Sequence, residues 1–181
     1  MIEVIKPGLY SSIQDKGRFG FENYGVPISG SMDQFSSILS NKIINNKDND
    51  AVMEITMIGP TLKFNTETTI SITGADMSPS LNGERINLFK PYIIKNGDIL
   101  SFGKLKAGLR TYLSVLNGFK TKKIMNSRSM YANITEEFRI SKGDKLNIES
   151  KINSNNTISL NDFDYLNHFK GFNFFEILIS S

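Results

Sequence analysis

Residues 109–115 read Leu-Arg-Thr-Tyr-Leu-Ser-Val, the clearest alternation of apolar and polar side chains in the chain. Successive side chains of a β-strand point to opposite faces of a sheet, so this segment is predicted to be a strand with two different faces. One face would carry Leu109, Thr111, Leu113 and Val115, and the other Arg110, Tyr112 and Ser114. If the first set packs into a core, the second set lines a pocket or meets solvent.

Other short runs, many of them with β-branched or aromatic residues, are also predicted to form strands. They are residues 2–5, 52–57, 61–64, 68–73, 92–94, 99–102, 138–140 and 145–149. Asn-Gly pairs at 82–83, 96–97 and 117–118 separate several of them, and this dipeptide readily adopts the positive φ angles of tight hairpins. Many short strands between turns favour a barrel or a sandwich over alternating βαβ units. The predicted fold class is therefore mainly β.

One principal helix is predicted at about 31–46. Ser31 is the expected N-cap, and Gln34 follows three residues later as in a capping box. Apolar residues then recur at helical spacing, and an Asn-Asn pair at 45–46 supplies the stop. We expect this helix to plug one end or one side of the β structure.

The composition excludes several classes of site. The chain has 181 residues, no cysteine and a single histidine, His168. A thiolate zinc site, a cysteine nucleophile and a His-rich metal site are therefore excluded within one chain. The net charge of +3 is too small to indicate a nucleic-acid partner. With no apolar run near the roughly 20 residues of a membrane span and no basic leader, we expect a soluble, cytoplasmic protein without a membrane partner.

The sequence changes character near residue 150, which predicts a boundary between a β unit at 1–150 and a tail at 151–181. Residues 151–161 are rich in Asn and Ser, as in a linker, and the last thirteen residues are crowded with Phe, Ile and Leu. We expect a terminal apolar strand there that needs a partner, because an open apolar edge promotes aggregation. His168 is expected on the surface of this tail.

The densest set of polar and glycine residues lies at 14–33. Arg18 offers a forked donor to a carboxylate or phosphate, but a structural loop in which Asp15 pairs with Arg18 explains the spacing equally simply. Glu54 lies in an apolar strand, either on its solvent face or as a buried carboxylate, and Asp76 ends a strand where it can face a cleft. Arg128 belongs either to a solvated basic loop or to an anion site. None of these segments has the form of an established catalytic signature.

The same segments, in the same order, resemble a known family. The motifs are Pro-Gly-Leu at 7–9, Gln-Asp-Lys-Gly-Arg-Phe-Gly at 14–20, Gly-Val-Pro-Ile-Ser-Gly-Ser-Met-Asp at 25–33, Met-Glu-Ile-Thr at 53–56, Gly-Pro at 59–60, Thr-Gly-Ala-Asp at 73–76, Leu-Asn-Gly at 81–83, Gly-Leu-Arg-Thr-Tyr-Leu at 108–113 and Ser-Arg-Ser at 127–129. The family comprises the C-type component of bacterial ATP-dependent 5-oxoprolinase, the related domain of urea carboxylase (urea amidolyase) and the partner of a kinase-inhibitor protein. It is also described as allophanate hydrolase subunit 2 or as a biotin-dependent carboxyltransferase family.

This resemblance implies a cyclophilin-like β-barrel, and it implies that the chain holds the first half of a longer family domain. The implied activity is cleavage of 5-oxoproline to glutamate with ATP hydrolysis, carried out with a B-type subunit (similar to allophanate hydrolase subunit 1) and a lactam-utilisation A-type subunit. On this resemblance, ATP is the cofactor of the complex, a small lactam is the substrate, and the chain alone is expected to be inactive. Two alternatives are a non-catalytic regulatory protein that binds a kinase-inhibitor-like partner, and a carboxyltransferase domain related to urea carboxylase.

The resemblance also selects site residues. Acid/base or positioning roles in catalysis are expected for Asp15, Asp33, Glu54 and Asp76. Substrate binding is expected for Gln14, Arg18, Arg110, Tyr112 and Arg128. The three arginines suit a carboxylate or phosphate, and no metal site is expected.

Overall fold

The structure, a computed structural model, describes residues 1–149. The predicted linker and terminal apolar strand at 151–181, together with His168, lie outside the described residues.

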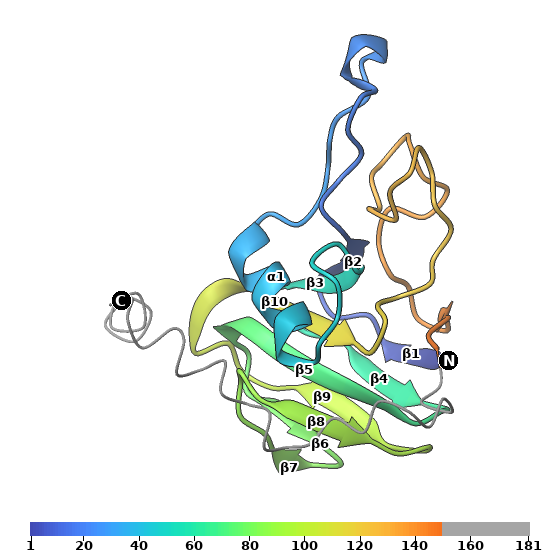
Figure 1. The fold of residues 1–181 in the computed structure, drawn as a ribbon. Helices are drawn as coiled ribbons and strands as arrows, with labels where there is room; N and C mark the ends of the chain where they lie inside the picture. Colours follow the sequence, from blue (N-terminus) through green and yellow to red (C-terminus); the bar gives the residue numbers. More distant parts are fainter. Residues whose placement is uncertain (150–181) are drawn as a thin grey trace.

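The strands form two antiparallel sheets (Figure 1). The first sheet has the order β11 (Lys145–Leu146), β1 (Ile2–Lys6), β4 (Thr61–Phe64), β9 (Ile99–Phe102), β6 (Pro79–Leu81) and β7 (Glu84–Arg85). The second has the order β2 (Tyr10–Gln14), β3 (Val52–Thr56), β10 (Ala107–Val115), β5 (Thr68–Asp76) and β8 (Pro91–Ile94). The mainly β prediction is confirmed. Within residues 1–149 the strands are divided between these two sheets and do not close into a barrel.

Most predicted strands are present, with two differences. Residues 138–140 form no strand; the backbone N–H of Ile140 donates to the carbonyl of Ser11 at 2.7 Å, and the hydroxyl of Tyr10 donates to the carbonyl of Phe138 at 3.3 Å. The run at 145–149 is shortened to β11, and β2, β6 and β7 are strands that the pattern did not predict. No helix among the described residues is long and apolar enough to cross a membrane.

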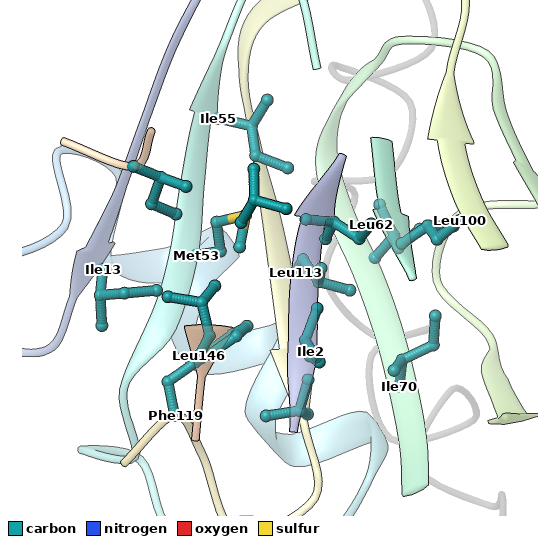
Figure 2. Packing of buried hydrophobic residues seen from close by; sticks show 14 of the residues in the cluster. Ile2, Ile13, Met53, Ile55, Leu62, Ile70, Leu100, Leu113, Phe119 and Leu146 are labelled. Carbon is teal, nitrogen blue, oxygen red and sulfur yellow. The ribbon is translucent and has the colours of Figure 1, made fainter. Parts of the chain in front are cut away.

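The hydrophobic core lies between the two sheets (Figure 2). Ile2 and Leu62 come from the first sheet, Met53 and Leu113 from the second, and all four side chains are fully buried. Burying an aliphatic side chain of this size contributes about 1.5–3 kcal/mol. Leu113 therefore lies on the core face predicted for residues 109–115, whereas Leu109, near the start of β10, is 48% exposed.

Helix α1 (Gln34–Ile43) is shorter than predicted and begins differently. Its N-cap is Asp33, whose Oδ1 accepts a hydrogen bond from the backbone N–H of Ser36 at 3.0 Å. The predicted cap, Ser31, lies before the helix, and Gln34 donates to its carbonyl at 3.0 Å. An aspartate at N-cap accepts from a free N–H of the first turn as well as a serine does, so sequence spacing alone did not distinguish the two.

The helix covers the second sheet (Figure 1). It contacts that sheet through its polar side. Ser36 and Ser40 are buried against β5 and β10, whereas Phe35, expected on the apolar face, is 54% exposed. The Oγ atoms of Ser40 and Ser114 lie 2.5 Å apart, and the hydroxyl of Thr73 donates to the carbonyl of Ser36 at 2.7 Å. The polar face of β10 is thus covered by a hydrogen-bonded helix.

A long loop joins β2 to α1 and rises away from both sheets (Figure 1). The short helix η1 (Glu22–Tyr24) forms its far end, and the loop 120–140 rises beside it. The lower parts of these two loops are joined by hydrogen bonds that the side chain of Asp15 accepts and the side chain of Arg18 donates.

Candidate active site

Asp15 is the centre of a buried hydrogen-bond network between the two loops. Its Oδ1 accepts from the N–H of Gly17 at 2.8 Å and from the hydroxyls of Ser127 and Ser129, each at 2.7 Å. Its Oδ2 accepts from the backbone N–H of Arg128 at 2.7 Å. Asp15 is only 5% exposed, so these donors take the place of water around the carboxylate. Oδ2 accepts fewer bonds than Oδ1 and retains capacity for a further donor.

Arg18 joins the same network from the opposite side. Its side chain is fully buried and donates to the Oγ of Ser29 at 2.6 Å and to the carbonyl of Ser129. Burial lowers the pKa of the Arg18 guanidinium, and the charge of Asp15 opposes this shift. The group stays ionised, because an arginine guanidinium is not deprotonated in proteins. Asp15 and Arg18 form no direct ion pair among the described residues; they are linked through Ser129.

Two glycines allow the two ends of the β2–α1 loop to approach each other. Gly17 has a φ of +105°, and a Cβ there would lie 2.7 Å from the carbonyl oxygen of Ile28. Gly30 has a φ of +92°, and a Cβ there would lie 2.9 Å from the backbone of Lys16. Where the two ends of the loop meet, the backbone N–H of Arg18 donates to the carbonyl of Ile28 at 2.7 Å. The glycines of the motif therefore keep the Asp15 network in place.

We expect Gly17→Ala to destabilise the protein more than Gly20→Ala. Both positions have positive φ, which costs a side chain about 1–2 kcal/mol. A Cβ at Gly20 would have no atom within 4 Å, whereas a Cβ at Gly17 meets backbone and adds about 1–3 kcal/mol of overpacking. Urea denaturation of the two variants measures the difference. Equal destabilisation of the two variants would show that the backbone around residue 17 tolerates the added methyl group.

A second buried cluster surrounds Glu54 on β3. Its Oε2 accepts from the hydroxyl of Tyr112 at 2.9 Å and from the backbone N–H of Met32 at 2.7 Å. Its Oε1 lies 3.4 Å from Nε of Arg110, a separation that makes an ion pair but no hydrogen bond. The hydroxyl of Tyr112 in turn accepts from the N–H of Asp33 at 2.8 Å. Of the two interpretations of Glu54, the buried carboxylate is correct, because Glu54 is 8% exposed.

This environment keeps Tyr112 neutral. Burial raises the pKa of the Tyr112 phenol well above its ordinary value of 10.0, and the negative charge of Glu54 adds to the rise. Tyr112 is fully buried, so its hydroxyl acts as a fixed donor to Glu54. We infer a positioning role for this pair.

The raised pKa of Tyr112 predicts a loss of stability at high pH. In the unfolded chain Tyr112 ionises near pH 10, whereas in the folded protein it stays neutral, so unfolding releases a proton. The contribution is fully present below pH 10 and is lost as the pH rises toward the folded pKa. Between pH 10 and 11 the unfolding free energy of the parent protein should fall by about 1 kcal/mol more than that of Tyr112→Phe. Parallel urea titrations at pH 9, 10 and 11 test this, and equal pH slopes would contradict it.

The segment 31–33 connects the two clusters. The backbone N–H of Ser31 donates to the carbonyl of Asp15 at 3.0 Å, and the next two N–H groups bind Glu54 and Tyr112. Three consecutive N–H groups just before α1 are therefore fixed from both sides, which defines the position of the helix start relative to Asp15.

The predicted site residues separate into two groups and one outlier. The first group holds Gln14, Asp15, Arg18 and Arg128, and the second holds Asp33, Glu54, Arg110 and Tyr112. The outlier is Asp76, which forms an ion pair with Arg85 at 3.2 Å and accepts from the N–H of Ser78. The structure connects Asp76 with neither cluster among the described residues. The roles of all these residues remain predictions.

Gln14 completes the first group. Its Nε2 donates to Ser12 at 2.9 Å and to the carbonyl of Met130 at 3.1 Å, while its buried Oε1 has no partner in the described structure. The Gln14 amide therefore fixes β2 against the loop 120–140 and leaves its own Oε1 without a donor.

Sequence reasoning missed the serines that complete the network. Ser127 and Ser129 are both fully buried, and their hydroxyls bind Asp15 from more than a hundred positions away in the chain. Their signal was the Ser-Arg-Ser motif at 127–129, which is part of the family resemblance but, as two hydroxyl residues around Arg128, is equally common in surface loops. Arg128 does contact the site through its backbone, while its side chain donates to the carbonyl of Thr121.

Two pockets adjoin Arg128. The smaller, of about 150 Å³, is lined by Asp15, Asn49, Asp50, Ala51, Asn117, Phe119, Lys120, Lys123, Asn126 and Arg128. The larger, of about 330 Å³, is lined by Lys120, Thr121, Lys122, Ile124, Arg128, Met130, Thr135, Glu136, Glu137, Asp144, Lys145, Leu146 and Asn147. Of these two, the smaller one includes Asp15. Within residues 1–149, no three side chains of the metal-binding types are grouped closely enough to hold a metal ion.

Comparison with known proteins matches this chain to a described family. A family model for the carboxyltransferase domain, subdomain A and B, matches residues 24–168. The urea amidolyase of Saccharomyces cerevisiae is 41% identical over 131 residues, which are 72% of this chain and 7% of that protein. The C-type component of the 5-oxoprolinase of Haemophilus influenzae is 30% identical over 129 residues, which are 71% of this chain and 42% of that protein. The chain thus spans less than half the length of either relative.

Solved structures share the fold. The urea carboxylase of Kluyveromyces lactis superposes with a TM-score of 0.77 and 42% identity, over 80% of this chain and 13% of that one. The protein TTHA0988 superposes with a TM-score of 0.77 and 26% identity, over 82% of this chain and 56% of that one.

Proposed function

The chain belongs to the family of carboxyltransferase domains, subdomains A and B, and from this premise we propose that it is a subunit of an enzyme complex that cleaves 5-oxo-L-proline to L-glutamate with hydrolysis of ATP. In that reaction, water adds to the lactam carbonyl carbon, the C–N bond breaks, and the nitrogen leaves as the amine of glutamate. The observation that carries the proposal is the buried Asp15–Arg18 network beside a small polar pocket.

The network supplies groups suited to a lactam. Asp15 lines the pocket, and its Oδ2 has capacity to accept the N–H of a ring amide. The buried guanidinium of Arg18 donates hydrogen bonds to Ser29 and Ser129, which hold its charge in the same network as Asp15. Fixed donors and acceptors of this kind can orient a substrate without reorganising when it binds.

ATP does not fit the pocket beside Asp15. Its volume of about 150 Å³ lies below the roughly 300–1,000 Å³ of sites for larger small molecules. Nor does the sequence contain a Gly-rich phosphate loop ending in Gly-Lys-Ser/Thr. We therefore place no nucleotide in this pocket and propose that another member of the complex binds it. The proposed partners are a B-type subunit and a lactam-utilisation A-type subunit, in a cytoplasmic complex.

The experiment is ATP-dependent release of glutamate from 5-oxoproline by the chain mixed with those two partner subunits. We expect product only when the chain, both partners and ATP are all present. Equal product in the mixture without this chain would overturn the proposal.

A second candidate is a carboxyltransferase acting on urea, which the higher identity to urea amidolyase favours. Its distinguishing readout is biotin- and ATP-dependent incorporation of bicarbonate into urea when the chain is combined with a biotin carboxylase and a biotin carrier. Incorporation without any glutamate release from 5-oxoproline would select this candidate.

A further inference from the structure

The pocket of about 150 Å³ has a charge distribution that the Asp15 network does not explain. Three cationic residues, Lys120, Lys123 and Arg128, line it together with Asn49 and Asn126. Its wall is almost entirely polar, and it is too small for a nucleotide or a peptide. The residues come from loops that are distant in the sequence.

Two of these cations form no ion pair within residues 1–149. Lys120 pairs with Glu149 at 2.9 Å, but within residues 1–149 neither Lys123 nor Arg128 forms an ion pair. Arg128 uses its side chain on the carbonyl of Thr121, which is neutral.

The two carboxylates on the pocket wall are already engaged by other donors. The oxygens of Asp15 accept hydrogen bonds from backbone and hydroxyl groups, and Oδ2 of Asp50 accepts from the N–H of Lys47 at 2.9 Å. Neither carboxylate pairs with Lys123 or Arg128. The pocket therefore offers two cations that form no ion pair within residues 1–149, beside two carboxylates that accept from neutral donors and amide groups that can donate or accept.

We propose that this pocket binds the carboxylate of a small anionic substrate, with Lys123 and Arg128 as its charged partners. The inference rests on the proposed function, and it specifies which part of 5-oxoproline lies where. The carboxylate lies between the two cations, and the ring amide lies toward Asp15 and the asparagines. Lys and Arg bind carboxylates through charge-assisted hydrogen bonds, which are about twice as strong as neutral ones. A neutral amide such as urea would leave both charges unused.

The experiment measures binding to the full 181-residue chain by titration calorimetry, with three probes. These are 5-oxoproline, its uncharged analogue 2-pyrrolidinone, and acetate. We expect 5-oxoproline to bind about tenfold more tightly than 2-pyrrolidinone, or better. We expect Lys123→Met to remove about that tenfold for 5-oxoproline and to leave 2-pyrrolidinone unchanged. Lys123 is exposed, so the variant should fold normally.

Lys122→Met is the matched control, because this exposed neighbour lines only the larger of the two pockets. It should leave the binding of all three probes unchanged. Lys123→Met with unchanged 5-oxoproline binding would overturn the inference while the glutamate assay could still support the proposed function. Conversely, Lys123-dependent acetate binding without 5-oxoproline binding would support a carboxylate site and count against 5-oxoproline as the substrate. Absence of binding by all three probes would overturn the inference.

Discussion

Asp15→Ala is expected to lower the free energy of unfolding by about 3–5 kcal/mol. The substitution removes the acceptor for Gly17, Ser127, Ser129 and the N–H of Arg128, all at 2.7–2.8 Å. Each of these donors would then be buried or half-buried without its partner. The fully buried cation of Arg18 would also lose its nearby negative charge. The loss therefore combines unsatisfied donors with an uncompensated charge.

Urea denaturation followed by circular dichroism measures this loss. Asp15→Asn should lose less, since its amide keeps one oxygen acceptor but places an N–H group where a carboxylate oxygen was. The control is Asp48→Ala, which removes an exposed carboxylate with ion pairs to Lys16 and Lys42 and should change stability by less than about 1 kcal/mol. If Asp15→Ala proves as stable as Asp48→Ala, the network does not hold the two loops together.

The second large effect is expected for Glu54→Ala, at about 2–4 kcal/mol. This substitution leaves the hydroxyl of Tyr112 and the N–H of Met32 without their acceptor. It also leaves Arg110, which is partly buried, without an ion pair among the described residues. Because Met32 precedes α1, the start of the helix should loosen as well as the sheet.

A double-mutant cycle separates the Glu54–Tyr112 contact from the rest of the cluster. Glu54→Gln and Tyr112→Phe are measured singly and together, and the coupling energy should be about 0.5–3 kcal/mol for groups in one hydrogen-bond network. Hydrogen exchange at the N–H of Met32 and Asp33 gives an independent readout, which should accelerate in Glu54→Ala. Additive single effects together with unchanged exchange would show that Glu54 does not position this segment.

The strands that sequence reasoning identified are runs with many β-branched or aromatic residues between turns. Residues 61–64 and 99–102 match β4 and β9 at both ends, and in 61–64 apolar and polar positions also follow the pleat. In contrast, β2 contains Tyr-Ser-Ser-Ile-Gln, whose serines suggest a loop. Both serines are nevertheless buried, since Ser11 donates to the carbonyl of Pro7 and Ser12 accepts from Gln14. In β2, side-chain hydrogen bonds therefore outweigh the loop tendency that the serines suggest.

Helix α1 shows what the spacing of apolar residues cannot predict. Its apolar residues indicated which segment is helical, but they did not indicate the buried side, because serines rather than Phe35 face the sheet. The hydroxyl groups on β5 and β10, at Ser71, Thr73 and Ser114, supply the partners for that polar side. A polar interface of this kind depends on tertiary pairing and is invisible to a hydrophobic pattern.

Residue spacing alone indicated only the part of the candidate site whose residues are close in sequence. Asp15 and Arg18 stand out through the glycines around them, and the resemblance to a family selected Glu54, Arg110 and Tyr112. The partners of Asp15 at 127 and 129 follow it by 112 and 114 positions, a distance over which spacing carries no information. Asp76 was selected by its strand-end position, yet Arg85 rather than the site is its partner.

The sequence distance between Asp15 and its serine partners has a consequence for biosynthesis. At translation rates of about 5–20 residues per second, a ribosome adds Ser127 roughly 6–22 seconds after Asp15. During that interval the carboxylate must remain hydrated, and the β2–α1 loop cannot close around Arg18 in its native form. Formation of the network is therefore a late event in vectorial folding, and the nascent chain exposes this loop to chaperones until residue 129 has left the exit tunnel.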